Sequence, residues 1–256
     1  MKIEITSPKE SGFSFVELSI VMAIIALLTA GIMVGQAIIQ SSKLRIIIVE
    51  MQTYEKAVLN FQEKYSGLPG DITNATSIFA SYPGIAANGN GNSNGQIADV
   101  SSTGTALEIL MVWQQLAYAG FIQGFYTGKN NGYKIGSDLP RSGYGLNTGY
   151  LIVYPTVYYS EPRSNVIIFG TVVPGASGSD KVTANAALLP SEAFNIDTKL
   201  DDGLPTTGKI IGATGYNITG FSTTDTLCGN GSGSARVYNL ASNIVYCFIR
   251  YRILTS

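Results

Sequence analysis

The chain has 256 residues, of which 13% are charged, and its formal net charge is −1. This length suits one large domain or two small ones, and the balanced charge gives no basic surface that would indicate a nucleic-acid partner. The sequence contains no histidine. It therefore lacks the commonest general base and zinc ligand, and every catalytic triad that needs imidazole is excluded.

An apolar segment dominates the N-terminal region. The first twelve residues, "MKIEITSPKESG", are polar, residues 18–39 are almost continuously apolar, and no charge follows Glu17 until Lys43. A helix of this length, about 33 Å, spans the hydrocarbon core of a bilayer, about 30 Å thick. We therefore expect a transmembrane helix. Glu17 then needs a partner or a function, because a carboxylate in hydrocarbon costs roughly 2.5–3.5 kcal/mol.

The helix is predicted to continue beyond the membrane as an amphipathic segment. Apolar residues recur in steps of three and four, which marks one face of a helix. They are Leu44, Ile47, Met51, Tyr54, Val58, Phe61 and Tyr65. Ile46 and Val49 lie off this stripe, so the helix is expected to face both its own domain and another subunit. Gly67, Pro69 and Gly70 in "YSGLPGD" predict its end.

The stretch "GFSFVEL" resembles the prepilin signature of type IV pilins and type II secretion pseudopilins. This chain and the signature share the same order of features: a polar leader, a glycine, an aromatic residue, a glutamate five residues into the mature chain and an apolar helix. The resemblance implies that a prepilin peptidase cuts after Gly12, that Phe13 becomes the N-methylated first residue, and that Glu17 acts in assembly.

The chemistry of the segment agrees with this resemblance. Cleavage would create an α-amino group about one helical turn from Glu17. Pairing of that amine with the Glu17 carboxylate of a neighbouring subunit would offset the desolvation of both charges and fix the register between helices. The alternative is that Glu17 merely extends to the membrane interface.

The remainder of the chain predicts an α+β domain. A Gly/Asn/Ser-rich connection, expected to contain a mobile loop, covers residues 84–105, and "TALEILMVWQQLAYAGFI" predicts a helix with Trp113 in the core. "YLIVYPTVYY" and "NVIIFGTVV" predict paired strands joined by a turn at "SEPRS", with Pro155 favouring an edge position. "LPSEAFNIDTKLDDG" predicts a helix, and "KIIGATG" and "SNIVYCFIRYRI" predict further strands.

The expected fold is a long N-terminal helix packed on an antiparallel sheet, pilin-like, with inserted helices and loops. The expected domains are a leader at residues 1–12, a transmembrane and assembly helix at 13–40, its amphipathic continuation at 41–66 and a periplasmic globular domain at 67–256.

Two groups of residues in the C-terminal part are candidate sites. Cys228 and Cys247 flank a Gly/Ser loop, and we expect a disulfide and an oxidising compartment, the alternative being two buried thiols. Asp197, Asp201 and Asp202 leave calcium binding open, although "DTKLDDG" departs from the EF-hand pattern and a capped helix end accounts for the acids. No cofactor and no metal site are predicted.

The expected function is structural rather than enzymatic. The chain would be a subunit, major or minor, of a type IV pilus or a type II secretion pseudopilus. Its partners would be other pilin-like subunits, a prepilin peptidase, an inner-membrane assembly platform and the membrane. It would cross the bacterial inner membrane once, with its C-terminal domain in the periplasm, before entering an extracellular pilus or periplasmic pseudopilus. The alternatives are a filament-tip adhesin, a DNA-uptake pilin or, from the enzyme class, a membrane-anchored hydrolase.

Overall fold

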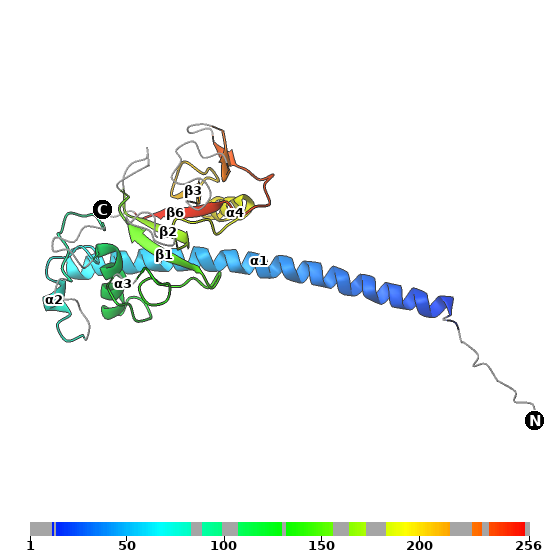
Figure 1. The fold of residues 1–256 in the computed structure, drawn as a ribbon, viewed down its shortest axis with the longest axis horizontal. Helices are drawn as coiled ribbons and strands as arrows, with labels where there is room; N and C mark the ends of the chain where they lie inside the picture. The colour runs from blue at the N-terminus through cyan, green and yellow to red at the C-terminus, as the bar shows by residue number, and fades with distance from the viewer. Residues whose placement is uncertain are drawn as a thin grey trace, which may run out of the picture. The chain divides into compact units, whose positions relative to one another are not determined.

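The computed structural model describes residues 12, 14–82, 89–98, 107–129, 132–155, 164–172, 183–215, 227–231 and 236–253. The chain divides into two compact units, residues 1–42 and residues 43–256. The division falls within helix α1, which runs from Phe15 to Tyr65 (Figure 1).

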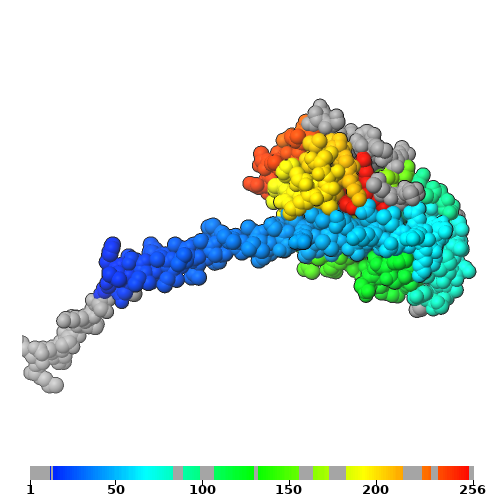
Figure 2. All heavy atoms as spheres, turned by 180° about the vertical axis from the view of Figure 1, so that it is seen from behind, coloured from blue at the N-terminus to red at the C-terminus, as the bar shows by residue number. Residues whose placement is uncertain are grey.

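The first unit is the apolar part of α1. The side chains of residues 15–42 are exposed apart from the partly buried Gly35, and Figure 2 shows them as an uncovered rod in blue. Within the described residues, α1 is the one helix that is long and apolar enough to cross a membrane. Apolar side chains without protein neighbours are what a helix surrounded by lipid or by other apolar helices requires.

The second unit is built on a four-stranded antiparallel sheet. Its strand order is β1-β2-β6-β3. The strands are β1 Thr148–Val153, β2 Val166–Thr171, β6 Cys247–Arg252 and β3 Ile210–Thr214. β1 lies at one edge of the sheet and ends two residues before Pro155, as the proline predicts. A second, two-stranded sheet pairs β4, Gly229–Asn230, with β5, Val237–Tyr238.

The register of the larger sheet places one residue from each of its four strands in a single row. Tyr150 of β1 lies opposite Phe169 of β2, which lies opposite Ile249 of β6, and Ile249 faces Gly212 of β3. All six residues of β1, and five of six in both β2 and β6, are buried. The sheet is therefore covered on both faces, which explains why these strands read as continuous apolar runs rather than alternating ones.

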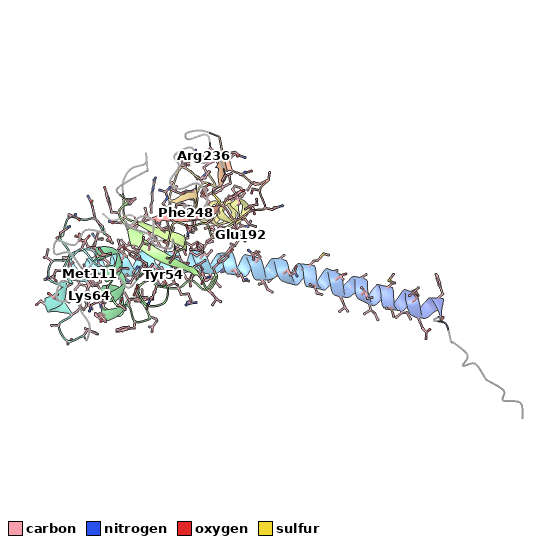
Figure 3. All side chains as sticks on the ribbon, viewed as in Figure 1. Tyr54, Lys64, Met111, Glu192, Arg236 and Phe248 are labelled. Atoms are coloured by element: carbon pink, nitrogen blue, oxygen red, sulfur yellow. A yellow bond between two sulfur atoms is a disulfide. The ribbon has the colours of Figure 1, made fainter. Side chains whose placement is uncertain are left out.

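The second half of α1 supplies the core of this unit, as its apolar stripe predicts. Leu44, Ile47, Met51, Val58 and Phe61 are buried. Tyr54 projects from this part of α1 (Figure 3). Its ring lies 5.0 Å from that of Trp113 and 5.1 Å from that of Tyr150 between centroids, both edge to face. Such aromatic pairs add about 0.5–1.5 kcal/mol each beyond their burial.

The described part of the second unit contains three further helices. They are α2 Ala75–Ile78, α3 Glu108–Tyr118 and α4 Pro190–Leu200. Trp113 of α3 is fully buried, which confirms its predicted place in the core. α4 contacts β3, β5 and β6, and Figure 2 shows it in yellow beside the orange β4–β5 segment.

One predicted strand is shorter than its sequence suggests. β6 begins at Cys247, and the preceding Ile244 and Val245 are exposed. The N–H of Ile244 donates to the hydroxyl of Ser242, whose own N–H donates to the carbonyl of Asn239. These local bonds satisfy the backbone in a turn, and this outweighs the strand preference of β-branched residues.

Candidate functional site

The start of α1 carries the residues that the prepilin resemblance selects. Gly12 is exposed, and Phe13 lies outside the described residues. The Glu17 carboxylate accepts the N–H of Ser14 at 2.9 Å, and the Ser14 hydroxyl accepts the N–H of Val16 at 3.4 Å. This pattern is a variant of the capping box, with the serine hydroxyl accepting from the second rather than the third helical residue, and it satisfies backbone donors that a helix start leaves free. Glu17 therefore has a partner within its own chain.

Three hydroxyl groups of the apolar segment bond to their own helix. The hydroxyls of Ser19, Thr29 and Ser42 donate to the carbonyls of Val16, Ala26 and Ile38, three or four residues earlier. A hydroxyl bonded to its own helix needs no water. Glu17, at the very start of the helix, is the charged side chain of residues 14–42, and its carboxylate can accept further hydrogen bonds from another molecule.

Two acidic residues tie the second half of α1 to the sheet. The Glu50 carboxylate accepts the hydroxyl of Tyr150 at 2.6 Å, the hydroxyl of Ser142 at 2.7 Å and the N–H of Gly143 at 3.0 Å. Tyr150 is fully buried, and the pKa of its hydroxyl is raised by burial first and by the Glu50 charge second. The hydroxyl therefore stays protonated and donates.

The second anchor lies one and a half turns further along the helix. Glu55 forms an ion pair with Lys209 at 2.8 Å and accepts the hydroxyl of Tyr251 at 2.6 Å. The Lys209 ammonium also lies 4.5 Å from the centre of the Tyr251 ring. With Glu50, this arrangement fixes the rotation and the axial position of residues 43–65 on β1, β3 and β6.

The cysteines form the expected disulfide. Cys228 and Cys247 are bonded, with their Cα atoms 5.1 Å apart, and both are fully buried. The bond joins the first residue of β6 to the residue before β4. It closes a sequence separation of 19 residues, for which the chain-entropy model gives about 3 kcal/mol.

The acidic residues after α4 stabilise a turn. Asp197 is fully buried and accepts the hydroxyl of Tyr238 at 2.7 Å and the N–H of Gly203 at 3.1 Å. Burial raises the pKa of Asp197 to about 7; these two hydrogen bonds oppose the rise, and the charges of Asp202 and Asp201 add to it. Like charges brought together in this way ionise reluctantly.

The other two carboxylates accept bonds from the residues that lead into β3. Asp201 accepts the backbone N–H groups of Lys209 and Ile210, and Asp202 accepts the hydroxyl of Thr207 at 2.6 Å. One oxygen from each of the three acids lies within 4.8 Å of the others. The described bonds show that the three acids hold the turn between α4 and β3.

The sequence analysis missed a pair of buried carboxylates outside this turn. Asp71 is 3% exposed and Glu108 is fully buried. Burial raises the pKa of Glu108 to about 7, the N–H groups of Ala98 and Asn92 lower it, and the charge of Asp71 raises it. The signal was present in the sequence: an acid closes "YSGLPGD", and another opens the helix after the Gly/Asn-rich connection. Residues 89–98 of that connection bind both carboxylates.

The leader at residues 1–11 and parts of the connection at residues 84–105 fall outside the described residues, as do two further expectations. The turn predicted at "SEPRS" lies almost entirely in residues 156–163, and part of the Gly/Ser loop between the cysteines, residues 232–235, is likewise outside the described ranges.

Comparison with known proteins gives one match. Residues 7–33 match the family model of the prokaryotic N-terminal methylation motif, which is the prepilin-type signature of type IV pilins and pseudopilins. No curated protein and no solved structure matches the chain.

Proposed function

We propose that this chain, which carries the prepilin-type methylation motif at residues 7–33, is the precursor of a filament subunit and is assembled through α1. The observation that carries the proposal is the position of the motif. It leads directly into an apolar helix segment whose side chains lack protein neighbours, and the same helix continues into the core of the folded domain. A subunit built this way can leave the bilayer by exchanging lipid for the apolar helices of its neighbours.

Processing is the first step of the proposed function. A prepilin peptidase cuts between Gly12 and Phe13, and the new terminal amine is methylated. The exposure of Gly12 ahead of the first helical residue, Phe15, supports this, because a peptide bond outside a helix is accessible to a protease.

Assembly then uses Glu17. In the described structure its carboxylate bonds the Ser14 N–H, but a carboxylate has two oxygens and can accept several bonds. The terminal amine of an adjacent subunit can therefore pair with it while the capping box stays in place. Pairing removes the cost of leaving either charge alone in an apolar surrounding.

The compartment follows from the disulfide. A bond between Cys228 and Cys247 forms and persists in an oxidising environment. We therefore place residues 43–256 in the periplasm, with α1 crossing the inner membrane once. The filament is either an extracellular type IV pilus or a periplasmic type II secretion pseudopilus. The chain is a major or a minor subunit of that filament, and an inner-membrane platform assembles the filament.

The experiment that tests processing is mass spectrometry of the full chain expressed with and without a prepilin peptidase. The expected product begins at Phe13 and carries one added methyl group. Gly12→Val should block cleavage, whereas Gly31→Ala, an exposed glycine within the helix with no neighbouring atom in reach, should be cut normally. An uncut wild-type chain in the presence of active peptidase contradicts the proposal.

A second experiment separates pairing between subunits from helix capping. Glu17→Val should abolish filament formation without preventing cleavage. Ser14→Ala weakens the capping box but keeps the carboxylate, so it should assemble normally, and Ser19→Val controls for removing a polar group from the same helix. If Ser14→Ala abolishes filament formation to the same extent as Glu17→Val, then Glu17 acts by capping its own helix, and the proposed pairing between subunits is wrong.

A further inference from the structure

The loop at residues 89–98 contains an exposed asparagine–glycine pair that contacts a buried acid. The pair is Asn94–Gly95. The N–H of Gly95 donates to one carboxylate oxygen of Asp71 at 2.8 Å. Asp71 lies 24 positions earlier in the chain and is only 3% exposed. The fold therefore places a carboxylate directly on the peptide nitrogen that follows an asparagine.

An asparagine followed by glycine can change chemically without an enzyme. The peptide nitrogen of the glycine attacks the amide carbon of the asparagine side chain, a five-membered succinimide ring forms, and ammonia leaves. Water then opens the ring at either carbonyl and gives aspartate or isoaspartate. The two steps together consume one water and release one ammonia, so they need no oxidant or reductant. Glycine favours the attack because it carries no Cβ beside the nitrogen.

The attacking nitrogen already has a base within reach. A peptide nitrogen is a nucleophile only as its proton leaves, and a general base must lie within about 2.6–3.2 Å of the atom that gives up the proton. The distance of 2.8 Å between the Gly95 nitrogen and the Asp71 oxygen meets this condition. The other oxygen of Asp71 accepts the N–H of Asn94 at 3.1 Å. These two bonds fix the orientation of the carboxylate toward Gly95.

The carbon that is attacked is polarised by a second contact. The side-chain oxygen of Asn94 accepts the N–H of Gln96 at 2.8 Å. Negative charge develops on this oxygen as the nitrogen adds to the carbon, and a donor that is already in place stabilises such a charge. The same bond holds the Asn94 side chain against the backbone that follows it, where the attacking nitrogen lies.

A second asparagine–glycine pair in the same loop, Asn90–Gly91, lacks this arrangement. The side-chain oxygen of Asn90 accepts the N–H and the hydroxyl of Thr76, a residue of α2. The N–H of Gly91 donates to the backbone carbonyl of Ile72 at 2.8 Å, and a peptide carbonyl is too weak a base to take its proton. Gly91 is also buried. The two pairs thus share a sequence and differ in their contacts.

We propose that Asn94 is a site of self-catalysed deamidation, in which Asp71 acts as the general base for the peptide nitrogen of Gly95. The bond that forms joins this nitrogen to the side-chain carbon of Asn94, and the bond that breaks joins that carbon to the side-chain nitrogen. One proton leaves Gly95 and one is taken up by the departing ammonia, so Asp71 is ionised again at the end. This modification does not depend on the filament function proposed above.

The product changes how the loop is held. Aspartate or isoaspartate at position 94 adds a negative charge beside the carboxylate of Asp71, and like charges in contact disfavour each other's ionised form. Isoaspartate also lengthens the main chain by one methylene group, which shifts the backbone N–H groups that Asp71 accepts. We therefore expect the loop to be held less tightly in an aged chain than in a newly made one.

The experiment is incubation of the purified full chain in detergent at neutral pH, followed by peptide mass spectrometry over time. Deamidation and isoaspartate should accumulate at Asn94 and not at Asn90. The exposed pair Asn230–Gly231 gives an internal reference rate. In urea, where the contacts of the fold are lost, Asn90 and Asn94 should react at similar rates because glycine follows both.

Two variants separate the base from the shape of the loop. Asp71→Asn keeps an oxygen that accepts the loop N–H groups but removes the base, and it should slow the reaction at Asn94 at least tenfold, since general-base catalysis contributes about 10²–10⁴-fold. Glu108→Gln alters the other buried acid, which accepts the N–H groups of Asn92 and Ala98. It should leave the rate at Asn94 unchanged. Circular dichroism verifies that each variant is folded.

Each outcome supports or overturns the site. Reaction at Asn94 that exceeds that at Asn230, slows in Asp71→Asn and persists in Glu108→Gln supports it. Reaction at Asn94 that is no faster than at Asn230, or that is as fast in Asp71→Asn, overturns it. Equal slowing in both variants overturns the role of Asp71 as a base. If Asp71→Asn does not fold, the ratio of the Asn94 rate to the Asn90 rate decides: it must be high in the folded wild type and near one in urea.

Discussion

Glu50 is the residue whose removal tests how the domain holds α1. Its carboxylate lies on the second half of α1 and accepts three hydrogen bonds from β1 and the turn before it. In Glu50→Ala the hydroxyls of Tyr150 and Ser142 lose a charged acceptor, and both residues are buried, at 0% and 3% exposure. The third donor, the N–H of Gly143, belongs to an exposed residue, and water can replace its partner.

The expected loss follows from these contacts. A hydrogen bond to a charged group contributes about 1.5–3 kcal/mol. The two hydroxyls lie 3.1 Å apart and can still bond each other, so the low end applies to each. Glu50→Ala should therefore lower the free energy of unfolding by about 3 kcal/mol. Glu50→Gln keeps one acceptor oxygen and should lose about half as much.

Urea unfolding of the detergent-solubilised chain measures this loss. Trp113 is the only tryptophan and is fully buried beside Tyr54, so its fluorescence reports the core that α1 forms with α3 and β1. Glu63→Ala, an exposed acid on the same helix, is the matched control and should change stability by no more than about 0.5 kcal/mol. A Glu50→Ala loss no larger than that of Glu63→Ala would show that the anchor contributes nothing, and the reasoning would be refuted.

Three further predictions concern the C-terminal turn, the disulfide and the loop at residues 89–98. The pKa of Asp197 is about 7 in the folded chain and 3.8 ordinarily, so the carboxyl ionises in the unfolded state before it does so in the folded state. The stability that this group contributes is therefore full below about pH 4 and is lost as the pH rises to about 7. The loss is up to about 1.4 kcal/mol per pH unit. Asp197→Asn should flatten that part of the stability–pH profile, and an unchanged slope in denaturation series at pH 5, 6 and 7 would contradict it. Cys247→Ser should lower the free energy of unfolding, measured by urea unfolding, by about 3 kcal/mol. Reduction of the wild-type disulfide should reproduce this loss. If neither change lowers the free energy of unfolding, the bond has no structural role. Gly91→Ala should cost about 1–3 kcal/mol because its Cβ would overlap the Asp71 backbone, whereas Gly145→Ala, where the added Cβ makes ordinary contacts, should be nearly neutral in the same unfolding assay.

Local patterns in the sequence were sufficient to predict most elements. The three- and four-residue spacing from Leu44 to Tyr65 identified the buried face of α1 because a helix of 3.6 residues per turn permits no other face to bury those side chains. Pro190 opens α4 and Gly203, at φ +76°, follows its end, because their backbone preferences act locally. The strand predicted before Cys247 was too long because a hydroxyl–backbone turn is not visible in strand preference.

Contacts between distant segments could not be predicted in the same way. Glu50 and Tyr150 are 100 residues apart, and Lys209 and Glu55 are 154 apart. Nothing in the sequence around Glu50 distinguishes it from the exposed Glu63 on the same helix, because both look like polar positions of an amphipathic pattern. Their different roles depend on which strand lies beside each one.

The sequence by itself determined the processing motif, the apolar segment and the buried stripe of α1, because each depends on the order of residues within a few turns of one helix. Only the tertiary structure brought Asp71 and Glu108, 37 positions apart, to the same Asn/Gly loop. It alone gave Asp197 a buried tyrosine partner. Burial and the approach of like charges change the chemistry of a carboxylate, and both are properties of the folded chain rather than of any short stretch of it.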